Sequence, residues 1–147
     1  MDLQVASIII AIFALLVSLG TLCVSFYSTY QDRPRLRIAT LFLEASEFGP
    51  NRVVVTLVNK GRRPIILRLV GGTTSEDHWS GSFIDFDKGG RRLAEHERHE
   101  ITLEKEDTIG FNPEGDDLIY VRLWIEDSLG NRHHIPNSES LIDKLRA

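Results

Sequence analysis

The sequence predicts an all-β protein: a seven-stranded antiparallel sandwich, preceded by one transmembrane α-helix and followed by a short C-terminal helix. Two observations lead to this prediction. No residue from Leu3 to Gln31 is charged, and after Pro34 the spacing of apolar residues changes from helical to alternating. We therefore expect an anchor in residues 1–30, a sandwich in residues 31–136 and a helical tail in residues 137–147.

The anchor is predicted from the run between Val5 and Tyr27, which is dominated by Ile, Leu, Val, Ala and Phe. A span over residues 5–27 is long enough to cross a hydrocarbon core about 30 Å thick. The alternative is a secretory signal peptide, but "MDLQ" lacks a basic region and no small-residue cleavage site precedes "YQDRP". The single cysteine, Cys23, lies inside the run, so we expect no disulfide in the β-domain.

Small residues recur along the anchor with a spacing of 4, 3, 4, 3 and 4, which places them on one stripe of a helix. They are Ser7, Ala11, Ala14, Ser18, Thr21 and Ser25. In lipid, close backbone approach and hydroxyl hydrogen bonds drive helix association, and a seven-residue repeat favours a left-handed crossing. The stripe predicts a packing seam for a second copy or a partner's helix; chance alignment of common residues is the alternative.

The strands follow in order along the rest of the chain. "RLRIATLFLE" alternates, and "NRVVVTLVNKGRRPIILRLV" gives two strands around a turn at Asn59, Lys60 and Gly61. Pro64 can open the second of these strands because it has no amide hydrogen to donate. Four further strands are predicted in "SGSFIDF", "RHEITLE", "DDLIYVRLWIED" and "RHHIP". Together these segments make seven strands.

Three stretches of this pattern resemble bacterial immunoglobulin-like sandwiches: "VVVTLVNKGRRPIIL", "RLAEHERHEITLE" and "YVRLWIEDSLGNRHHI". The resemblance covers residues 35–136 and is architectural. The chain lacks the two core cysteines of antibody domains, and Trp124 is not the tryptophan of their third strand. The resemblance implies an immunoglobulin-like fold, which serves adhesion, scaffolding and accessory roles alike and therefore carries no function.

Antiparallel strands place successive loops at alternate ends of the sandwich, and one end then collects basic residues. They are Arg33, Arg35, Arg37, Lys60, Arg62, Arg63, Lys88, Arg91, Arg92 and Arg132. The opposite end collects acids, and the net charge of the whole chain is −4.

The basic end follows the anchor closely, so we expect it to face an anionic cytoplasmic leaflet. The positive-inside rule gives the same orientation: a single-pass inner (plasma) membrane protein with its N-terminus outside and its β-domain cytoplasmic. Solvated loops are the alternative.

A partner face is predicted on "LIYVRLWIE". Alternation turns four residues inward: Ile119, Val121, Leu123 and Ile125. The three between them then face outward: Tyr120, Arg122 and Trp124. These residue types are enriched at interaction hot spots, although a sheet edge or a covering loop could also bury them.

The tail "NSESLIDKLRA" predicts a short helix led by Asn137 or Ser138, with Leu141, Ile142 and Leu145 docking onto the sandwich.

No catalytic residue, metal site or cofactor is predicted. "HERHE" has His-Glu-x-His spacing, which does not place two imidazoles on one helical face. The acidic stretch "EKEDTIGFNPEGDD" reads as a solvated loop or a weak site for a divalent cation.

The sequence therefore favours a membrane-anchored, non-enzymatic interaction module of bacterial or phage type, which recruits or modulates a membrane protein partner. Its expected partners are membrane lipid and another membrane protein, or itself through the helix, and no nucleic acid. The alternative is an extracytoplasmic binding domain for an envelope ligand or divalent cation, with the reversed topology. A small hydrolase is disfavoured because no convergent acid, base and nucleophile can be read from the sequence.

Overall fold

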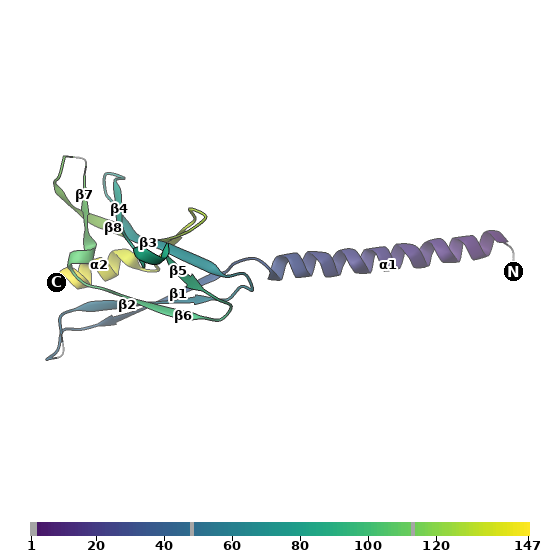
Figure 1. Ribbon diagram of the computed structural model, residues 1–147, viewed down its shortest axis with the longest axis horizontal. Coiled ribbons are helices and arrows are strands. Elements are labelled where there is room, and N and C mark those ends of the chain that lie inside the picture. Colours follow the sequence, from purple (N-terminus) through teal and green to yellow (C-terminus); the bar gives the residue numbers. More distant parts are fainter. Residues whose placement is uncertain (1–2, 48, 113) are drawn as a thin grey trace. The chain divides into compact units, whose positions relative to one another are not determined.

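The computed structural model describes residues 3–47, 49–112 and 114–147. The chain divides into two compact units, Met1–Arg33 and Pro34–Ala147 (Figure 1). The first unit consists mainly of helix α1 (Leu3–Gln31). The second unit holds the strands, two short 3-10 turns and helix α2 (Ser138–Arg146).

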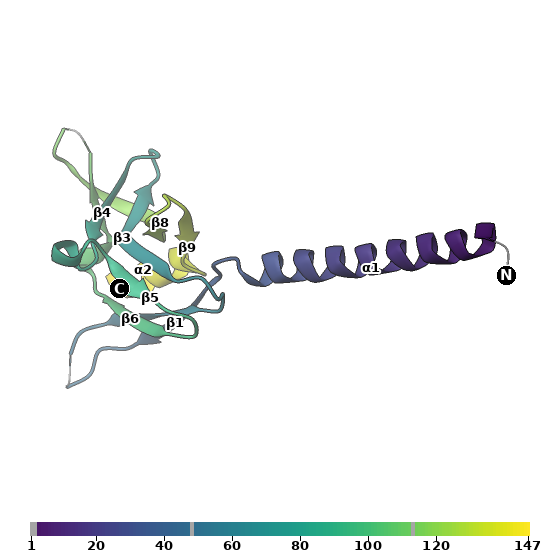
Figure 2. The same ribbon diagram turned by 45° about the vertical axis from the view of Figure 1, so that its right-hand side comes forward.

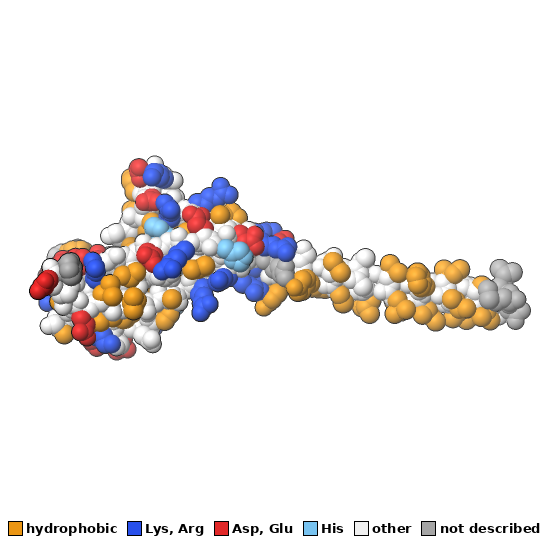
Figure 3. All heavy atoms as spheres, turned by 90° about the horizontal axis from the view of Figure 1, so that it is seen from below, with side chains coloured by type: hydrophobic (Ala, Val, Ile, Leu, Met, Phe, Trp, Pro, Cys, Tyr) orange, Lys and Arg blue, Asp and Glu red, His pale blue; other side chains and the backbone are white. Residues whose placement is uncertain are grey.

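Helix α1 is mostly apolar and carries no charged residue. Its segment Gln4–Tyr30 has a mean hydropathy of 2.7 and is long and apolar enough to cross a membrane. The face seen in Figure 3 carries hydrophobic side chains along its length. Hydroxyl groups inside the segment are satisfied by the helix itself: Ser18 donates to the Ala14 carbonyl (2.8 Å) and Thr21 to the Ser18 carbonyl (2.8 Å). Such back-bonding lowers the cost of placing hydroxyl groups in hydrocarbon.

The second unit contains two antiparallel sheets. The first has the order β1-β2-β6, with the bounds β1 Leu36–Leu43, β2 Arg52–Asn59 and β6 Arg98–Leu103. The second has the order β4-β3-β8-β7, with β5 also pairing with β3 and β9 with β8. Its bounds are β3 Ile65–Thr74, β4 Trp79–Phe83, β5 Arg91–Leu93, β7 Ile109–Phe111, β8 Asp117–Asp127 and β9 Arg132–His134.

The mainly β architecture in two antiparallel sheets confirms the coarse fold prediction, but the count of seven strands is wrong. The described residues form nine strands, because β5 and β7 were not predicted. Each is three residues long, which is too short for an alternating pattern to emerge. The 3-10 turn η1 (Phe86–Lys88) separates β4 from β5, and η2 (Glu106–Thr108) precedes β7.

The core lies between the two sheets and is closed by α2. Alternate residues of β2 (Val53, Val55 and Leu57) are fully buried against residues of β3 and β8. Both ribbon views show α2 between the sheets (Figures 1 and 2). As predicted, Leu141, Ile142 and Leu145 of α2 are buried in this core. The expected cap is wrong in its detail: Asn137 leads the helix with φ 54°, and its side chain forms no capping hydrogen bond.

Candidate functional site

Basic side chains gather where β1 begins and where β2 connects to β3. Leu36 pairs with Asn59, and the amide of Lys60 donates to the carbonyl of Arg35 at 2.7 Å, so the two segments lie side by side. We call the exposed basic residues of these segments the basic end. They are Arg35, Arg37, Lys60, Arg62 and Arg63.

The basic end is held in place by the fully buried side chain of Asn59. Its amide donates to the carbonyl of Arg63 (2.8 Å) and to that of Leu93 in β5 (3.2 Å). Its carboxamide oxygen accepts from the amide of Gly61 at 2.9 Å. The turn predicted at Asn59, Lys60 and Gly61 is therefore tied to the neighbouring sheet, which limits the freedom of its basic residues.

Two other members of the predicted basic set, Lys88 and Arg132, lie outside the basic end, so the prediction of one ten-residue cluster is wrong. Arg33 belongs to the first unit. Arg91 lies 3.9 Å from Asp85 and 3.8 Å from Glu97, so its charge is compensated. Lys88 is on η1.

Lys88 lies outside the basic end because β4, η1 and β5 run alongside β3 and do not form a connection at its end. Arg92, opposite Ile66 of β3, is exposed beside the basic end. Arg98 was not predicted as part of the cluster, yet it flanks Val58 in β6 as Arg37 does in β1, and it is ion-paired with Glu100.

The predicted outward position of Tyr120 is wrong, because its side chain is only 4% exposed. The pairing of β8 with β3 shifts between Thr73↔Arg122 and Thr74↔Tyr120, so Val121 is an extra residue in β8. A bulge of this kind reverses the alternation and turns Tyr120 to the same side as Leu123.

Two glycines make room for the ring of Tyr120. A Cβ atom at Gly72 of β3 or at Gly110 of β7 would overlap that ring. The phenol hydroxyl shares a hydrogen bond with the hydroxyl of Ser80 in β4. Burial raises the pKa of the Tyr120 phenol, and the hydrogen bond to Ser80 offsets part of this effect. Tyr120 is therefore a core residue that connects four strands.

Trp124 faces outward as predicted but is covered. It lies between the core residues Leu123 and Ile125, so its side chain is on the opposite face of the sheet. Its indole N–H donates to the Thr73 hydroxyl at 3.1 Å. The guanidinium of Arg132 lies 4.4 Å from the centre of its ring, and Trp79 contacts it edge-on at 6.0 Å. The prediction of an exposed Trp124 is therefore wrong.

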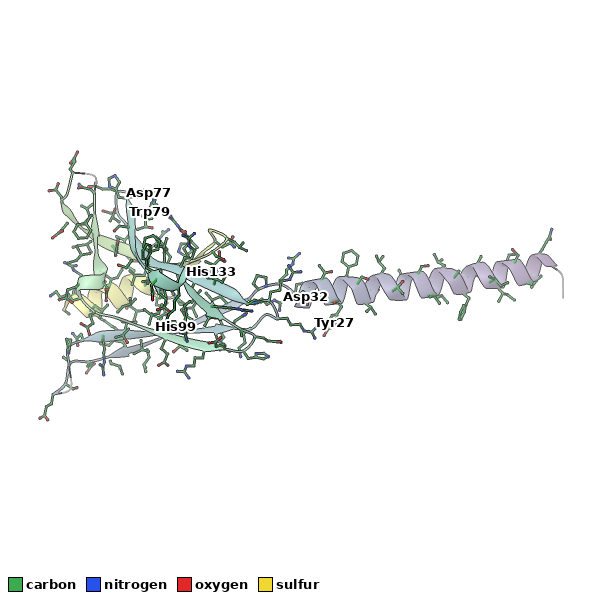
Figure 4. All side chains as sticks on the ribbon, viewed as in Figure 1. Tyr27, Asp32, Asp77, Trp79, His99 and His133 are labelled. Carbon is green, nitrogen blue, oxygen red and sulfur yellow. The ribbon has the colours of Figure 1, made fainter. Side chains whose placement is uncertain are left out.

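The exposed part of this surface is supplied by Trp79, which was not predicted as part of it. Trp79, labelled in Figure 4, opens β4. The residue is 53% exposed, and the guanidinium of Arg132 lies 4.6 Å from the centre of its ring. Arg122 is exposed on β8. We call Trp79, Arg122 and Arg132 the Trp-Arg face. The signal that could have found Trp79 is the alternation of Trp79, Gly81 and Phe83 in "HWSGSF"; the predicted strand began one residue too late.

A cavity of about 220 Å³ lies near the end of the domain opposite the basic end. Ser80 and Tyr120 form part of its wall with Phe111, and Glu106 and Asp107 of η2 lie at its rim. None of its described lining residues is a histidine, cysteine, lysine or arginine. The Ser80 and Tyr120 hydroxyls are hydrogen-bonded to each other in this wall.

The histidines do not form a metal centre within residues 3–47, 49–112 and 114–147, where no group of three or more potential ligands converges. Burial lowers the pKa of His99, and the positive charge of Arg91 lowers it further. His133 lies 3.1 Å from a carboxylate oxygen of Asp127, which also accepts from Asn131 (3.0 Å). These hydrogen bonds close the turn between β8 and β9.

The six residues of the predicted seam occupy one stripe of α1, because the observed helix turns by about 100° per residue. The described side chains of this stripe are exposed. The hydroxyls of Ser18 and Thr21 are already bonded within the helix, so close packing of small side chains is the main contribution that the stripe offers to association.

Comparisons with known proteins add little to this description. No protein-family model and no curated protein matches the chain. Among solved structures, the chain is similar to one described as the X-ray structure of Northeast Structural Genomics Consortium target SoR45. The likeness covers 71% of this chain and 82% of that chain, with 12% sequence identity and a TM-score of 0.30. A likeness at this level carries no argument about function.

Proposed function

We propose that this protein is a membrane-anchored, non-enzymatic interaction module whose β-domain rests its basic end on anionic lipid and recruits or modulates a membrane protein. The observation that carries the proposal is the gathering of five exposed basic residues at the basic end. This end is close to the apolar helix along the chain. Only residues 32–35 separate Gln31 from Leu36, so the connecting chain reaches at most about 18 Å.

Electrostatics supports a contact with anionic lipid. A basic side chain near an anionic leaflet contributes on the order of 1 kcal/mol, within a Debye length of about 8–10 Å. The short connection limits how far the start of β1 can lie from the leaflet once α1 spans the bilayer. In the proposed orientation the β-domain is on the cytoplasmic side of the inner membrane and the N-terminus is outside, in agreement with the positive-inside rule.

The immunoglobulin-like topology is part of this proposal. β1, β2 and β6 neighbour one another as the first, second and fifth strands of such a domain do, and β3, β8 and β9 as its third, sixth and seventh strands do. β7 and α2 are then additions to the common fold. Domains of this kind serve many roles, so the topology by itself specifies neither a function nor a partner.

We assign contact with the protein partner to the Trp-Arg face. Tryptophan and arginine are the residue types most enriched at interaction hot spots. Arg132 holds the two tryptophan rings in a fixed arrangement, which lowers the entropy lost when a partner binds.

A photo-reactive residue in place of Trp79 should cross-link a membrane protein in cells, whereas the same residue at the exposed Thr102 of β6 should not. Equal cross-linking from both positions would contradict this assignment.

The lipid contact is tested with residues 34–147, which contain the whole hydrophobic core and are expected to fold alone. This fragment should sediment with phosphatidylglycerol vesicles at low salt and should be released as salt rises. The triple variant Lys60→Glu, Arg62→Glu, Arg63→Glu should lose most of this binding. Reversal of Glu114 and Asp116 in the β7–β8 turn is the control. Binding that survives the triple variant would exclude the basic end as the lipid contact.

A further inference from the structure

β4 is the edge strand of the second sheet, and one side of its backbone has no partner. Its bonds to β3 can be placed from two contacts: the Thr74 amide donates to the His78 carbonyl (2.8 Å), and the Ile84 amide to the Arg68 carbonyl (2.8 Å). Such bonds alternate along an antiparallel pair, so three residues of β4 turn their amides and carbonyls away from β3. They are Trp79, Gly81 and Phe83. No residue that the structure describes pairs with them there.

The cavity of about 220 Å³ borders this free edge. β4 and β7 approach each other, with Cα atoms within 8 Å, but do not pair (Figure 1). The cavity is lined by both strands, through Ser80 and Ser82 of β4 and through Ile109 and Phe111 of β7. The two serines are small and leave the inner side of β4 open. A strand added to β4 would therefore direct every second side chain between β4 and β7, into the cavity.

The rim of this cavity carries negative charge that no basic lining residue compensates. Glu106 and Asp107 of η2 are the charged residues of its described lining. Asp107 accepts from the Glu104 amide (2.8 Å), whereas the carboxylate of Glu106 has no hydrogen-bond or ion-pair partner among the described residues. Lys105 does not line the cavity and donates to the carbonyl of Arg146 at 3.2 Å. A cationic side chain is therefore the electrostatic complement of this rim.

The outer side of β4 is apolar and unprotected. Trp79 and Phe83 are exposed there, and Gly81 between them has no side chain. Free edge strands usually carry a charged residue, a proline or a bulge that prevents pairing with another chain. β4 contains no charged residue and no proline, and its register against β3 is continuous. The edge is therefore open to a further strand, whose side chains would meet the two exposed rings.

We propose that the free edge of β4 binds an extended segment of the membrane protein partner, which adds as an antiparallel strand and places one lysine or arginine side chain in the cavity beside Glu106. This inference rests on the proposed interaction role and names the kind of segment recognised next to the Trp-Arg face, to which Trp79 belongs. In strand addition, backbone hydrogen bonds give affinity and pockets for alternate side chains give specificity. Here the cavity selects the cationic residue, and the rings of Trp79 and Phe83 select apolar neighbours.

The test uses the full chain in detergent micelles with ¹⁵N-labelled backbone amides, and an acetylated, amidated probe peptide of sequence Thr-Val-Lys-Val-Thr. The peptide should shift the amide signals of Trp79, Gly81 and Phe83 saturably. Replacing its lysine by glutamate should weaken binding by at least about tenfold, because the carboxylates at the rim repel a like charge. Glu106→Gln should weaken binding of the lysine peptide about fivefold. Glu139→Gln, at an exposed acid outside the cavity, is the matched control and should leave binding unchanged.

N-methylation of the peptide separates strand addition from simple charge attraction. In antiparallel pairing with its lysine in the cavity, the valine amides bond to β4 and the lysine amide points away from it. Methyl groups on both valine nitrogens should therefore abolish binding, whereas one on the lysine nitrogen should not. Equal binding of the two methylated peptides, shifts that never saturate, or unweakened binding to Glu106→Gln would overturn the proposal. Loss of peptide binding with intact cross-linking at Trp79 would refute strand docking and leave the proposed function standing.

Discussion

The guanidinium of Arg132 lies 4.4 Å from the centre of the Trp124 ring and covers a side chain that would otherwise face solvent. The same group lies 4.6 Å from Trp79 and donates through Nε to Glu126 at 3.0 Å. One arginine therefore connects β9 with β4 across the outer face of the second sheet. Its removal should affect both the stability of this sheet and the exposure of the indole ring.

Arg132→Gln should lower the free energy of unfolding by about 0.5–2 kcal/mol, the range of cation–π contacts that are exposed or partly desolvated. Urea unfolding of residues 34–147 measures this change. Tryptophan emission of the folded variant should shift to longer wavelength, because Trp124 becomes accessible to water. Arg92→Gln, which removes an exposed arginine without a ring contact in the described structure, should change neither quantity. An unchanged emission spectrum in Arg132→Gln would show that the guanidinium does not cover Trp124.

Gly110→Ala should destabilise the domain by about 1–3 kcal/mol, the usual cost of overpacking a core. The added methyl group would overlap the ring of Tyr120, which is confined between Gly110 and Gly72 and bonded to Ser80. Urea unfolding measures the loss. Ser75→Ala in the exposed β3–β4 turn is the control and should remain within about 0.5 kcal/mol of the parent. A Gly110→Ala variant as stable as the parent would mean that Tyr120 does not require the glycine.

Asp127 gives the domain an acid-sensitive contribution to stability. Burial alone would raise the pKa of its carboxyl, but hydrogen bonds from Asn131, His133 and Leu129 together lower it below the ordinary value. A carboxyl with a lowered folded-state pKa contributes stability that is complete above its unfolded-state pKa of about 4. That contribution is lost as pH falls from about 4 through the folded-state pKa.

Asp127→Asn should therefore be less stable than the parent at pH 7, and the difference should shrink as pH falls below about 4. Urea unfolding at a series of pH values measures it. Asp116→Asn, on the exposed β7–β8 turn, is the control. A difference that stays constant from pH 7 to pH 3 would show that the carboxylate is not favoured by the fold.

Long alternating segments made most of the fold predictable. β1, β2 and β8 each have at least eight residues, so their apolar periods are visible, and the apolar face of α2 is visible for the same reason. β5 and β7 were not predicted because three residues are too few to show an alternating pattern. Each of these strands is defined by its pairing with a longer neighbour.

The partner face could not be predicted correctly because its residues depend on distant parts of the chain. The bulge at Val121 becomes visible only in the register of β8 against β3, and it reverses the direction of Tyr120. Trp124 is covered by side chains from β4 and β9, and no local pattern indicates this. The start of the basic end, in contrast, was predictable because a hairpin places Arg35 beside Lys60 whatever the rest of the sheet does.

Larger side chains in the seam test whether α1 associates with a second copy through this stripe. Replacing Ala11 and Ala14 by Ile should weaken self-association in a membrane two-hybrid assay, because larger side chains separate the backbones. Leu16→Ile, which alters the opposite side of the helix, should leave the signal unchanged. A wild-type chain that gives no signal, or a double variant that associates as well as the parent, would exclude self-association through this stripe.

The orientation of the chain can be tested at Ser75, which is exposed in the β3–β4 turn, whereas its neighbour Thr74 is buried. In a Cys23→Ser background, a cysteine at position 75 should resist a membrane-impermeant maleimide in intact cells, because the proposed topology places the β-domain in the cytoplasm. The same cysteine should react fully once the membrane is permeabilised. A cysteine added at the N-terminus should show the reverse behaviour and serves as the control. Ready labelling at position 75 in intact cells would place the β-domain outside and favour an extracytoplasmic binding domain instead.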